Sequence, residues 1–147
     1  MIGARQAAIY ADEWGWGLPL EALIYEISAR FLREFKPDRE QCWVAERDGK
    51  MLGGVFLVEE PGERDTARLR LLYVEPDARG LGVGSALVRQ CTEFAREVGY
   101  KRIVLWTHAV LHSARRIYEA EGYVITGTEE QDEFGKPEKS EFWLLEL

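Results

Sequence analysis

The chain has 147 residues, of which 46% are apolar and 31% charged, and its formal net charge is −7. This length suits one hydrophobic core, so we expect residues 1–147 to form a single domain, and the composition excludes a disordered polypeptide. No apolar run approaches the roughly 20 residues that span a membrane, and the surplus of carboxylates disfavours nucleic acid as a partner, because phosphate binding needs cations.

The N-terminal part of the chain predicts two helices. It begins MIGARQAAIYADEWGW, with no basic segment leading into a long apolar stretch, so we expect a cytoplasmic protein rather than a secreted one. A short helix is expected over 7–14. Glycines and a proline separate it from a second helix over 18–35, whose apolar residues recur every three or four positions. Lys36-Pro37 ends this helix.

The next segment has the alternation and turn residues of strands. Runs over 42–47 and 51–59 flank Asp48-Gly49, a dipeptide that tolerates the positive φ angles of a tight hairpin turn. A polar loop over 61–65 is expected to follow. The third strand covers 67–74 and is stopped by a proline, which has no N–H to donate to a strand ladder.

The second half of the chain changes between helical and strand patterns. Its expected elements are a helix over 85–98 capped by Gly99, a buried strand over 103–106, a helix over 113–121 ended by Gly122, and strands over 123–128 and 141–147 that close a hairpin around 134–137. This order predicts an α/β fold in which helices pack on a mixed sheet.

The two cysteines are expected to be buried, reduced thiols. Cys42 opens the first strand, and Cys91 falls on the apolar face of the helix over 85–98. Neither position predicts a disulfide, and we expect no metal site.

The most informative segment reads LLYVEPDARGLGVGS, in which a strand stops and three alternating glycines open a helix. The first turn of a helix has unpaired N–H groups and partial positive charge, so it binds phosphate oxygens when side chains leave it accessible. Gly80, Gly82 and Gly84 carry no Cβ atom to block an anion. Arg79 adds a cation and Ser85 a hydroxyl.

Two common phosphate motifs do not fit this segment. A P-loop needs a lysine before the hydroxyl residue, whereas Ser85 directly follows Gly84. A dinucleotide fingerprint needs a third glycine where Ser85 stands and an acidic residue near the end of the next strand, and residues 103–107 contain none. A tight strand-to-helix turn with no ligand remains an alternative.

The pattern Arg79-x-x-Gly82-x-Gly84, after a strand ending in Val74-Glu75-Pro76, resembles the acetyl-CoA signature of GNAT acetyltransferases, Q/R-x-x-G-x-G/A. The segment from Ala114 through Tyr118 to Gly122-Tyr123 resembles the family's second signature, A-x-x-x-Y-x-x-x-G-F. The whole pattern is similar to the acetyltransferase half of bacterial proteins that join a MarR-like winged helix to a GNAT domain, and we expect no DNA-binding half within residues 1–147.

This resemblance implies a mixed, mostly antiparallel sheet flanked by helices, with central strands that splay apart. It implies acetyl-CoA as co-substrate, with free backbone groups near Val74 pairing with the pantetheine arm and the Val74 N–H serving as an oxyanion donor. The cofactor-binding residues that it implies are Leu72, Tyr73, Val74, Arg79, Gly80, Leu81, Gly82, Val83, Gly84 and Ser85.

The resemblance also assigns catalytic candidates. Tyr118 takes the family's position for the general acid, since a phenol is protonated at neutral pH and can donate to a departing thiolate. A core aromatic is the alternative for Tyr118. The chain has Leu111 and His108 where relatives commonly carry asparagine, and His108 is a candidate base or pantetheine contact, with a surface or helix-capping role as the alternative. Glu75 is a candidate base or a local turn residue.

The implied reaction is transfer of an acetyl group to a primary amine of a small molecule or peptide, by direct attack in a ternary complex. An acceptor pocket is expected at the first helices, from Trp14, Trp16, Tyr25 and Glu26. A non-catalytic acyl-CoA sensor and a different nucleotide-binding protein remain alternatives. The aromatic content is compatible with a homodimer, while the acceptor, the acyl chain length and the general base stay open.

Overall fold

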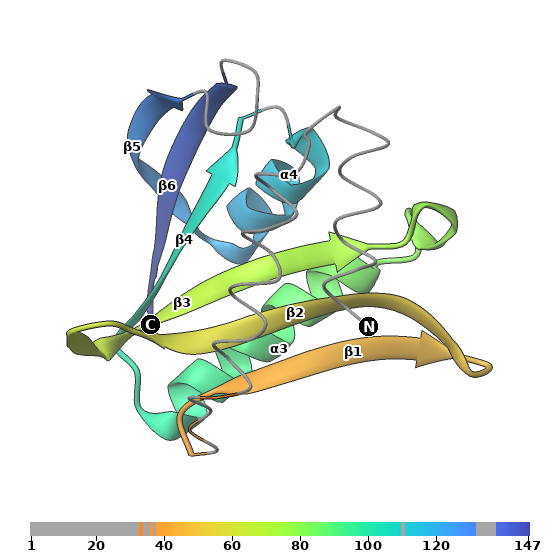
Figure 1. The fold of residues 1–147 in the computed structure, drawn as a ribbon, viewed down its shortest axis with the longest axis horizontal. Coiled ribbons are helices and arrows are strands. Elements are labelled where there is room, and N and C mark those ends of the chain that lie inside the picture. Colours follow the sequence, from red (N-terminus) through yellow and green to blue (C-terminus); the bar gives the residue numbers. More distant parts are fainter. Residues whose placement is uncertain (1–32, 34–35, 37, 110, 132–137) are drawn as a thin grey trace.

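The computed structural model describes residues 33, 36, 38–109, 111–131 and 138–147, which form a sheet with helices against it. Apart from Arg33, the helices expected over 7–14 and 18–35 lie outside this part of the chain, as do the residues proposed for the acceptor pocket. The sheet has six strands in the order β1-β2-β3-β4-β6-β5 (Figure 1). The strands are β1 Gln41–Arg47, β2 Lys50–Glu60, β3 Glu63–Val74, β4 Arg102–His108, β5 Val124–Gln131 and β6 Glu138–Glu146.

The first three strands form an antiparallel meander. The hairpin predicted at Asp48-Gly49 is confirmed, since both residues have positive φ, 52° and 78°. The polar loop expected over 61–65 is wrong in its extent. Residues 61 and 62 make the turn, and strand pairing resumes at Glu63, because β2 and β3 continue past the core and pair their exposed ends.

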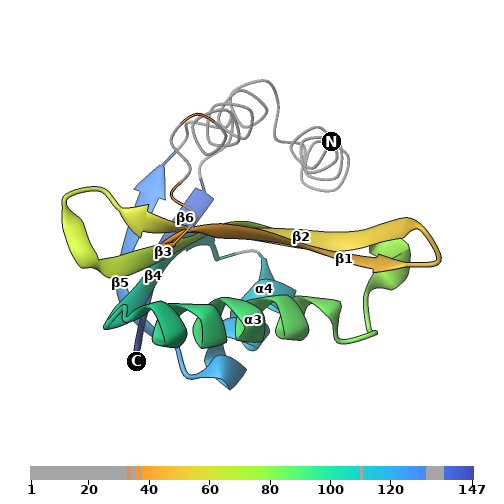
Figure 2. The same ribbon diagram turned by 90° about the horizontal axis from the view of Figure 1, so that it is seen from below.

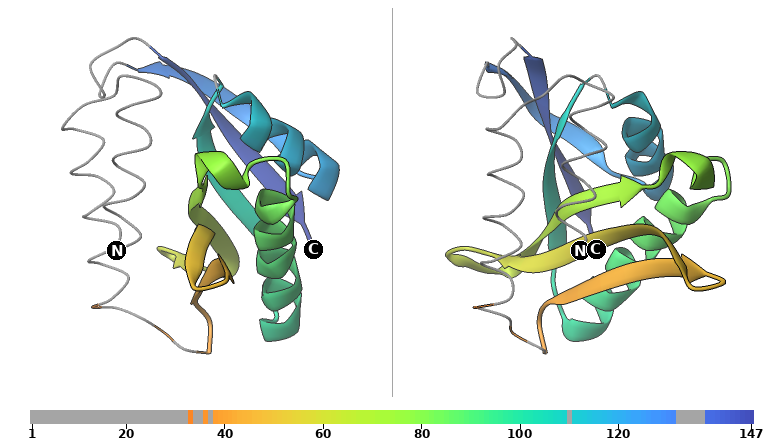
Figure 3. Two further views of the ribbon diagram at one scale, coloured as in Figure 1. Left: turned by 90° about the vertical axis from the view of Figure 1, so that its right-hand side faces the viewer. Right: turned by 45° about the vertical axis from the view of Figure 1, so that its right-hand side comes forward.

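β3 and β4 pair only near their starts, and this divides the sheet into two halves. Their parallel register joins Thr66–Arg68 to Arg102–Val104, and beyond it the two strands diverge (Figures 1 and 3). β3 carries a bulge just beyond this pairing, where Leu71 takes a φ of 54° and the register against β2 shifts. A bulge bends its strand and increases the local twist. The splayed central strands implied by the sequence are therefore confirmed.

β6 lies between β4 and β5, and pairs antiparallel with both. The pairing of the last two strands was predicted, whereas the place of β6 beside β4 was not. Two large side chains, Trp143 and Leu145, alternate on the core face of β6 and are nearly fully buried. This apolar face explains why the last strand occupies an inner position, with β5 at the edge of the sheet.

Helices α3 (Val83–Val98) and α4 (His112–Glu121) cover the same face of the sheet (Figure 2), and a short helix, η1 (Pro76–Ala78), links β3 to α3. α3 ends at Gly99, whose φ of 96° confirms the predicted left-handed cap. Its buried stripe includes Cys91, as predicted. Both cysteines are free, and burial raises the pKa of Cys91 far above its usual range and that of the half-buried Cys42 to about 11.

Candidate functional site

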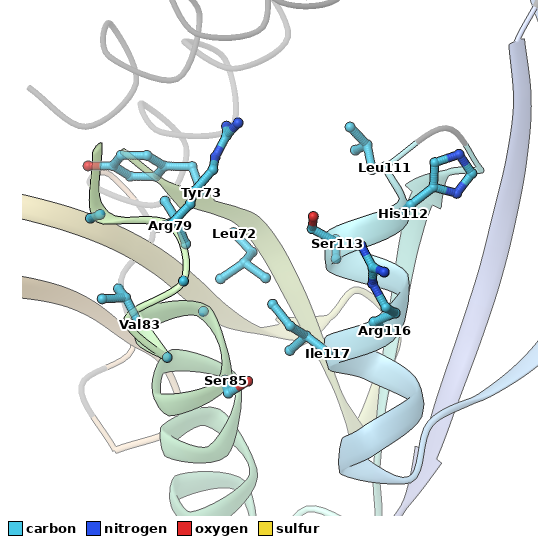
Figure 4. Close-up of a pocket in the computed structure, with 16 residues that line it drawn as sticks. Leu72, Tyr73, Arg79, Val83, Ser85, Leu111, His112, Ser113, Arg116 and Ile117 are labelled. Carbon is cyan, nitrogen blue, oxygen red and sulfur yellow. The ribbon is translucent and has the colours of Figure 1, made fainter. Parts of the chain in front are cut away.

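A cavity of about 540 Å³ lies between the end of β3, the start of α3 and the first two turns of α4 (Figure 4). Its β3 and α3 wall consists of Leu72, Tyr73, Val74, Ala78, Arg79, Gly80, Gly82, Val83, Gly84 and Ser85. Its opposite wall consists of Leu111, His112, Ser113, Ala114, Arg116 and Ile117. The cavity therefore occupies the region where the two halves of the sheet separate.

The N-terminus of α3 opens into this cavity without a side-chain cap. Gly82 is the N-cap residue, and the first helical hydrogen bond runs from the Ala86 N–H to the Gly82 carbonyl at 3.0 Å. The N–H groups of Val83, Gly84 and Ser85 therefore have no carbonyl partner within the helix. No acidic side chain stands in the first turn. This end of α3 is suited to bind an anion.

Two of the three glycines make the turn that exposes these N–H groups. Gly80 and Gly82 have φ of 88° and 79°, a region that residues with a Cβ atom rarely adopt. A Cβ atom on either would meet nothing within 4 Å, so both face open space. At Gly80 and Gly82 the structure therefore agrees with the prediction that a missing Cβ atom leaves the N-terminus of the helix accessible to an anion.

Gly84 serves a different purpose from the one expected. It is buried inside α3, and a Cβ atom built on it would stand 2.6 Å from Ile117 Cδ1 on α4 and 3.4 Å from Val74 Cγ2. The absence of a side chain at Gly84 thus allows α3 to pack closely against α4. The α3 and α4 walls of the cavity therefore contact each other at Gly84.

We predict that Gly84→Ala and Ile117→Val are energetically coupled, because the second change removes the Cδ1 atom that the first would strike. Ile117→Val alone should destabilise the protein by about 1 kcal/mol. In the Gly84→Ala background it should cost at least about 0.5 kcal/mol less. Urea unfolding of the four proteins of this cycle measures the coupling, and strictly additive changes would contradict the contact.

Contacts outside the cavity hold its walls in place. On the α3 side, the Glu75 N–H donates to the Leu52 carbonyl at 2.7 Å, and Lys50 forms an ion pair with Asp77 of η1. On the opposite side, Arg115 Nε of α4 donates to Glu141 Oε1 of β6 at 2.8 Å, and Glu141 is almost fully buried. Each wall is therefore attached to its own half of the sheet.

The structure brings most of the predicted cofactor-binding residues together. All of them line the cavity except Leu81, which is 58% exposed. The sequence analysis did not predict that residues of α4 line the cavity. Ser113, Arg116 and Ile117 are three residues and one residue apart, which places them on one face of the helix. That spacing was visible in the sequence, but nothing local indicated which face of α4 would meet α3.

The predicted catalytic residues lie in two kinds of position. Val74 lines the cavity, at the end of β3. Tyr118 does not: it is 4% exposed and packs in the core, with its ring centroid 5.6 Å from that of Tyr123 and 6.0 Å from that of Trp143. The aromatic packing proposed as an alternative for Tyr118 is thus present, and its role as an acid stays a prediction.

Glu75 and His108 are both buried and neither lines the cavity. Glu75 is 6% exposed and stands in the turn between β3 and η1. His108 is 4% exposed, at the end of β4, with its ring 4.9 Å from that of Trp106. The surface and capping roles considered for His108 are wrong, because the side chain is buried and Leu111 is the N-cap residue of α4.

The cavity is positively charged. Of the described residues that line it, Arg79 and Arg116 are cationic, His112 is titratable, and none is Asp or Glu. The site thus combines anion-binding groups with an apolar slot between two helices.

Within the described ranges, no group of three or more His, Cys, Asp or Glu side chains is placed to hold a metal ion. None of the helices in that part of the chain is long and apolar enough to cross a membrane.

Residues 6–123 match the model of the Acetyltransferase (GNAT) family. Human N-acetyltransferase 8 is 36% identical over 100 residues, which cover 65% of this chain and 44% of the human protein. The match therefore spans less than half the length of that relative.

Solved structures share the fold. The Salmonella typhimurium protein yncA, classed as an acetyltransferase and solved with its cofactor acetyl-CoA, superposes with a TM-score of 0.74 over 99% of this chain and 86% of its own, at 21% identity. A Bacillus anthracis protein classed as a streptothricin acetyltransferase, in complex with acetyl coenzyme A, gives 0.67 over 77% of this chain and 65% of its own, at 25% identity.

Proposed function

The chain belongs to the GNAT acetyltransferase family, and on that premise we propose that it transfers an acetyl group from acetyl-CoA to a primary amine of a small molecule or peptide. One observation carries the proposal. The uncapped first turn of α3 opens into a cavity that lies where β3 and β4 separate. A ligand with a phosphate at one end and a long amide-containing arm suits such a site.

The residues present fit the pyrophosphate of acetyl-CoA. The N–H groups of Val83–Ser85 have no partner within α3, Gly80 and Gly82 leave open space beside them, and Arg79 lines the same wall. Charge-assisted hydrogen bonds of this kind are about twice as strong as neutral ones. The complexes of yncA and of the Bacillus anthracis protein with acetyl-CoA support acetyl-CoA as the ligand of this fold.

The pantetheine arm would lie along the part of β3 that has no β4 partner. Leu72 and Val74 line the cavity there, beyond the last paired residue, Arg68. An extended ligand can add to such an edge through main-chain hydrogen bonds. We assign the Val74 N–H as the donor to the thioester oxygen, whose negative charge grows as the amine attacks.

The reaction that we propose is direct. The neutral amine nitrogen attacks the thioester carbon, the C–N bond forms and the C–S bond breaks, and the thiolate of CoA leaves. The attacking nitrogen loses one proton and the thiolate gains one. Tyr118 is proposed to supply the thiolate's proton, and Glu75 or His108 to accept the nitrogen's. Because none of the three lines the cavity, we propose that water carries both protons.

The test is release of CoA from acetyl-CoA in the presence of polyamines, aminoglycosides, amino acids and short peptides. The protein's own thiols should contribute little to a thiol-reagent signal, because burial raises the pKa of both cysteines. Amine-dependent release with acetylated product detected by mass spectrometry is the expected result. Saturable binding of acetyl-CoA without turnover on any amine would favour a non-catalytic acyl-CoA sensor.

Several finer expectations from the sequence stay predictions: a single domain over 1–147, the likeness to the acetyltransferase half of MarR-fused proteins, a cytoplasmic location and a homodimer. Size-exclusion chromatography with light scattering measures the last of these. The amine panel decides the acceptor, and the same assay with longer acyl-CoAs decides the acyl chain length.

A further inference from the structure

A second cation faces the cavity from the wall opposite α3. Arg116 lies in the second turn of α4, and its side chain is exposed. Among the described residues it has no ion-pair or hydrogen-bond partner, in contrast to its neighbour Arg115, which pairs with Glu141. Figure 4 shows Arg116 on the cavity side of α4 together with Ser113. It is therefore available to a ligand.

The packing of the helices places Arg116 close to the anion-binding end of the cavity. Its neighbour Ile117 is the α4 residue whose Cδ1 stands 2.6 Å from a Cβ atom built on Gly84. Gly84 belongs to the first turn of α3, which presents the unpaired N–H groups. The second turn of α4 and the first turn of α3 thus face each other across the same part of the cavity.

The charge of the lining favours a ligand with more than one anionic group. The chain carries 26 acidic and 19 basic residues, yet no Asp or Glu is found among the described residues that line the cavity, while two arginines stand on its opposite walls. Arg79 and the unpaired N–H groups of the α3 turn already offer partners to one pyrophosphate. Arg116, on the opposite wall, is placed to bind a further phosphate of the same ligand.

We infer that Arg116 binds the ribose 3′-phosphate of CoA and makes the site selective for CoA over derivatives that lack this group. The inference rests on the proposed function. A phosphate monoester carries close to two negative charges at neutral pH, which makes its burial costly and suits an exposed position at the rim of the cavity. The planar guanidinium of arginine can bind two oxygens of one phosphate.

Isothermal titration calorimetry with CoA and with dephospho-CoA, which lacks only the 3′-phosphate, tests the assignment without any need for turnover. The wild-type protein should bind CoA roughly tenfold more tightly than dephospho-CoA, the effect of about one charge-assisted hydrogen-bonded contact. Arg116→Ala should lose roughly tenfold in affinity for CoA and less than about twofold for dephospho-CoA.

Arg96→Ala is the matched control, because Arg96 is an exposed arginine in the last turn of α3, at the end away from the cavity. It removes the same charge and should leave both affinities unchanged. If Arg116→Ala lowers the affinity for CoA and for dephospho-CoA equally, Arg116 binds the pyrophosphate and the inference is overturned. If neither affinity falls, Arg116 does not contact the ligand and the inference is also overturned. Failure of the wild-type protein to bind either ligand would refute the proposed function itself.

Discussion

Replacing Gly82 by valine should lower the affinity for CoA by about 100-fold or more. Gly82 has a φ of 79° at the N-cap of α3, where a β-branched residue is strained. Valine would push the backbone out of this conformation, turn the N–H groups of the first turn, and fill the open space beside them. Two lost charge-assisted hydrogen bonds at about 1.5 kcal/mol each correspond to this factor. Calorimetric titration with CoA measures it.

Gly99→Val is the control for backbone strain. Gly99 caps the other end of the same helix with a φ of 96°, and a Cβ atom there also meets nothing within 4 Å. Both variants should lose a similar amount of stability in urea unfolding, of the order of 1–2 kcal/mol, whereas only the Gly82 variant should lose CoA. Unchanged affinity in folded Gly82→Val would refute the assignment of the α3 turn to the pyrophosphate.

Tyr118→Phe should slow turnover by roughly 10²-fold while the affinity for acetyl-CoA stays the same, because the change removes a proton donor and keeps the aromatic ring. The side chain is packed between Tyr123 and Trp143, and phenylalanine preserves that packing. Steady-state kinetics with an acceptor found in the amine panel, together with calorimetric binding of acetyl-CoA, separates kcat from affinity.

Tyr123→Phe makes the same chemical change in the adjacent, equally buried tyrosine. Burial raises the pKa of Tyr123 well above its usual range, and its hydroxyl has no hydrogen-bond partner among the described residues. This variant should keep full activity and should not lose stability. If Tyr118→Phe behaves like Tyr123→Phe, Tyr118 is a core residue, and the thiolate must receive its proton from water or another group.

The sequence by itself determined the features that depend on neighbours along the chain. The Asp48-Gly49 hairpin, the glycine turn and the Gly99 cap follow from backbone angles that few residues adopt. The stop at Pro76 follows from the missing N–H of proline. Helix α3 was predicted from apolar residues that recur every three or four positions along the sequence. Helix α4 was predicted from its pattern and from Gly122 at its end. The second signature, which lies within this segment, carried part of the family resemblance that the match over 6–123 supports.

Only the tertiary structure decided which distant segments meet. Four features depend on residues that are far apart in sequence. They are the insertion of β6 beside β4, the separation of β3 from β4 after Arg68, the contact of Gly84 with Ile117, and the place of Arg116 in the cavity wall. Local periodicity shows that a helix has an apolar face, but it does not show which other element that face will contact. That contact depends on the close packing of complete side chains from different elements, and that information exists only once the chain has folded.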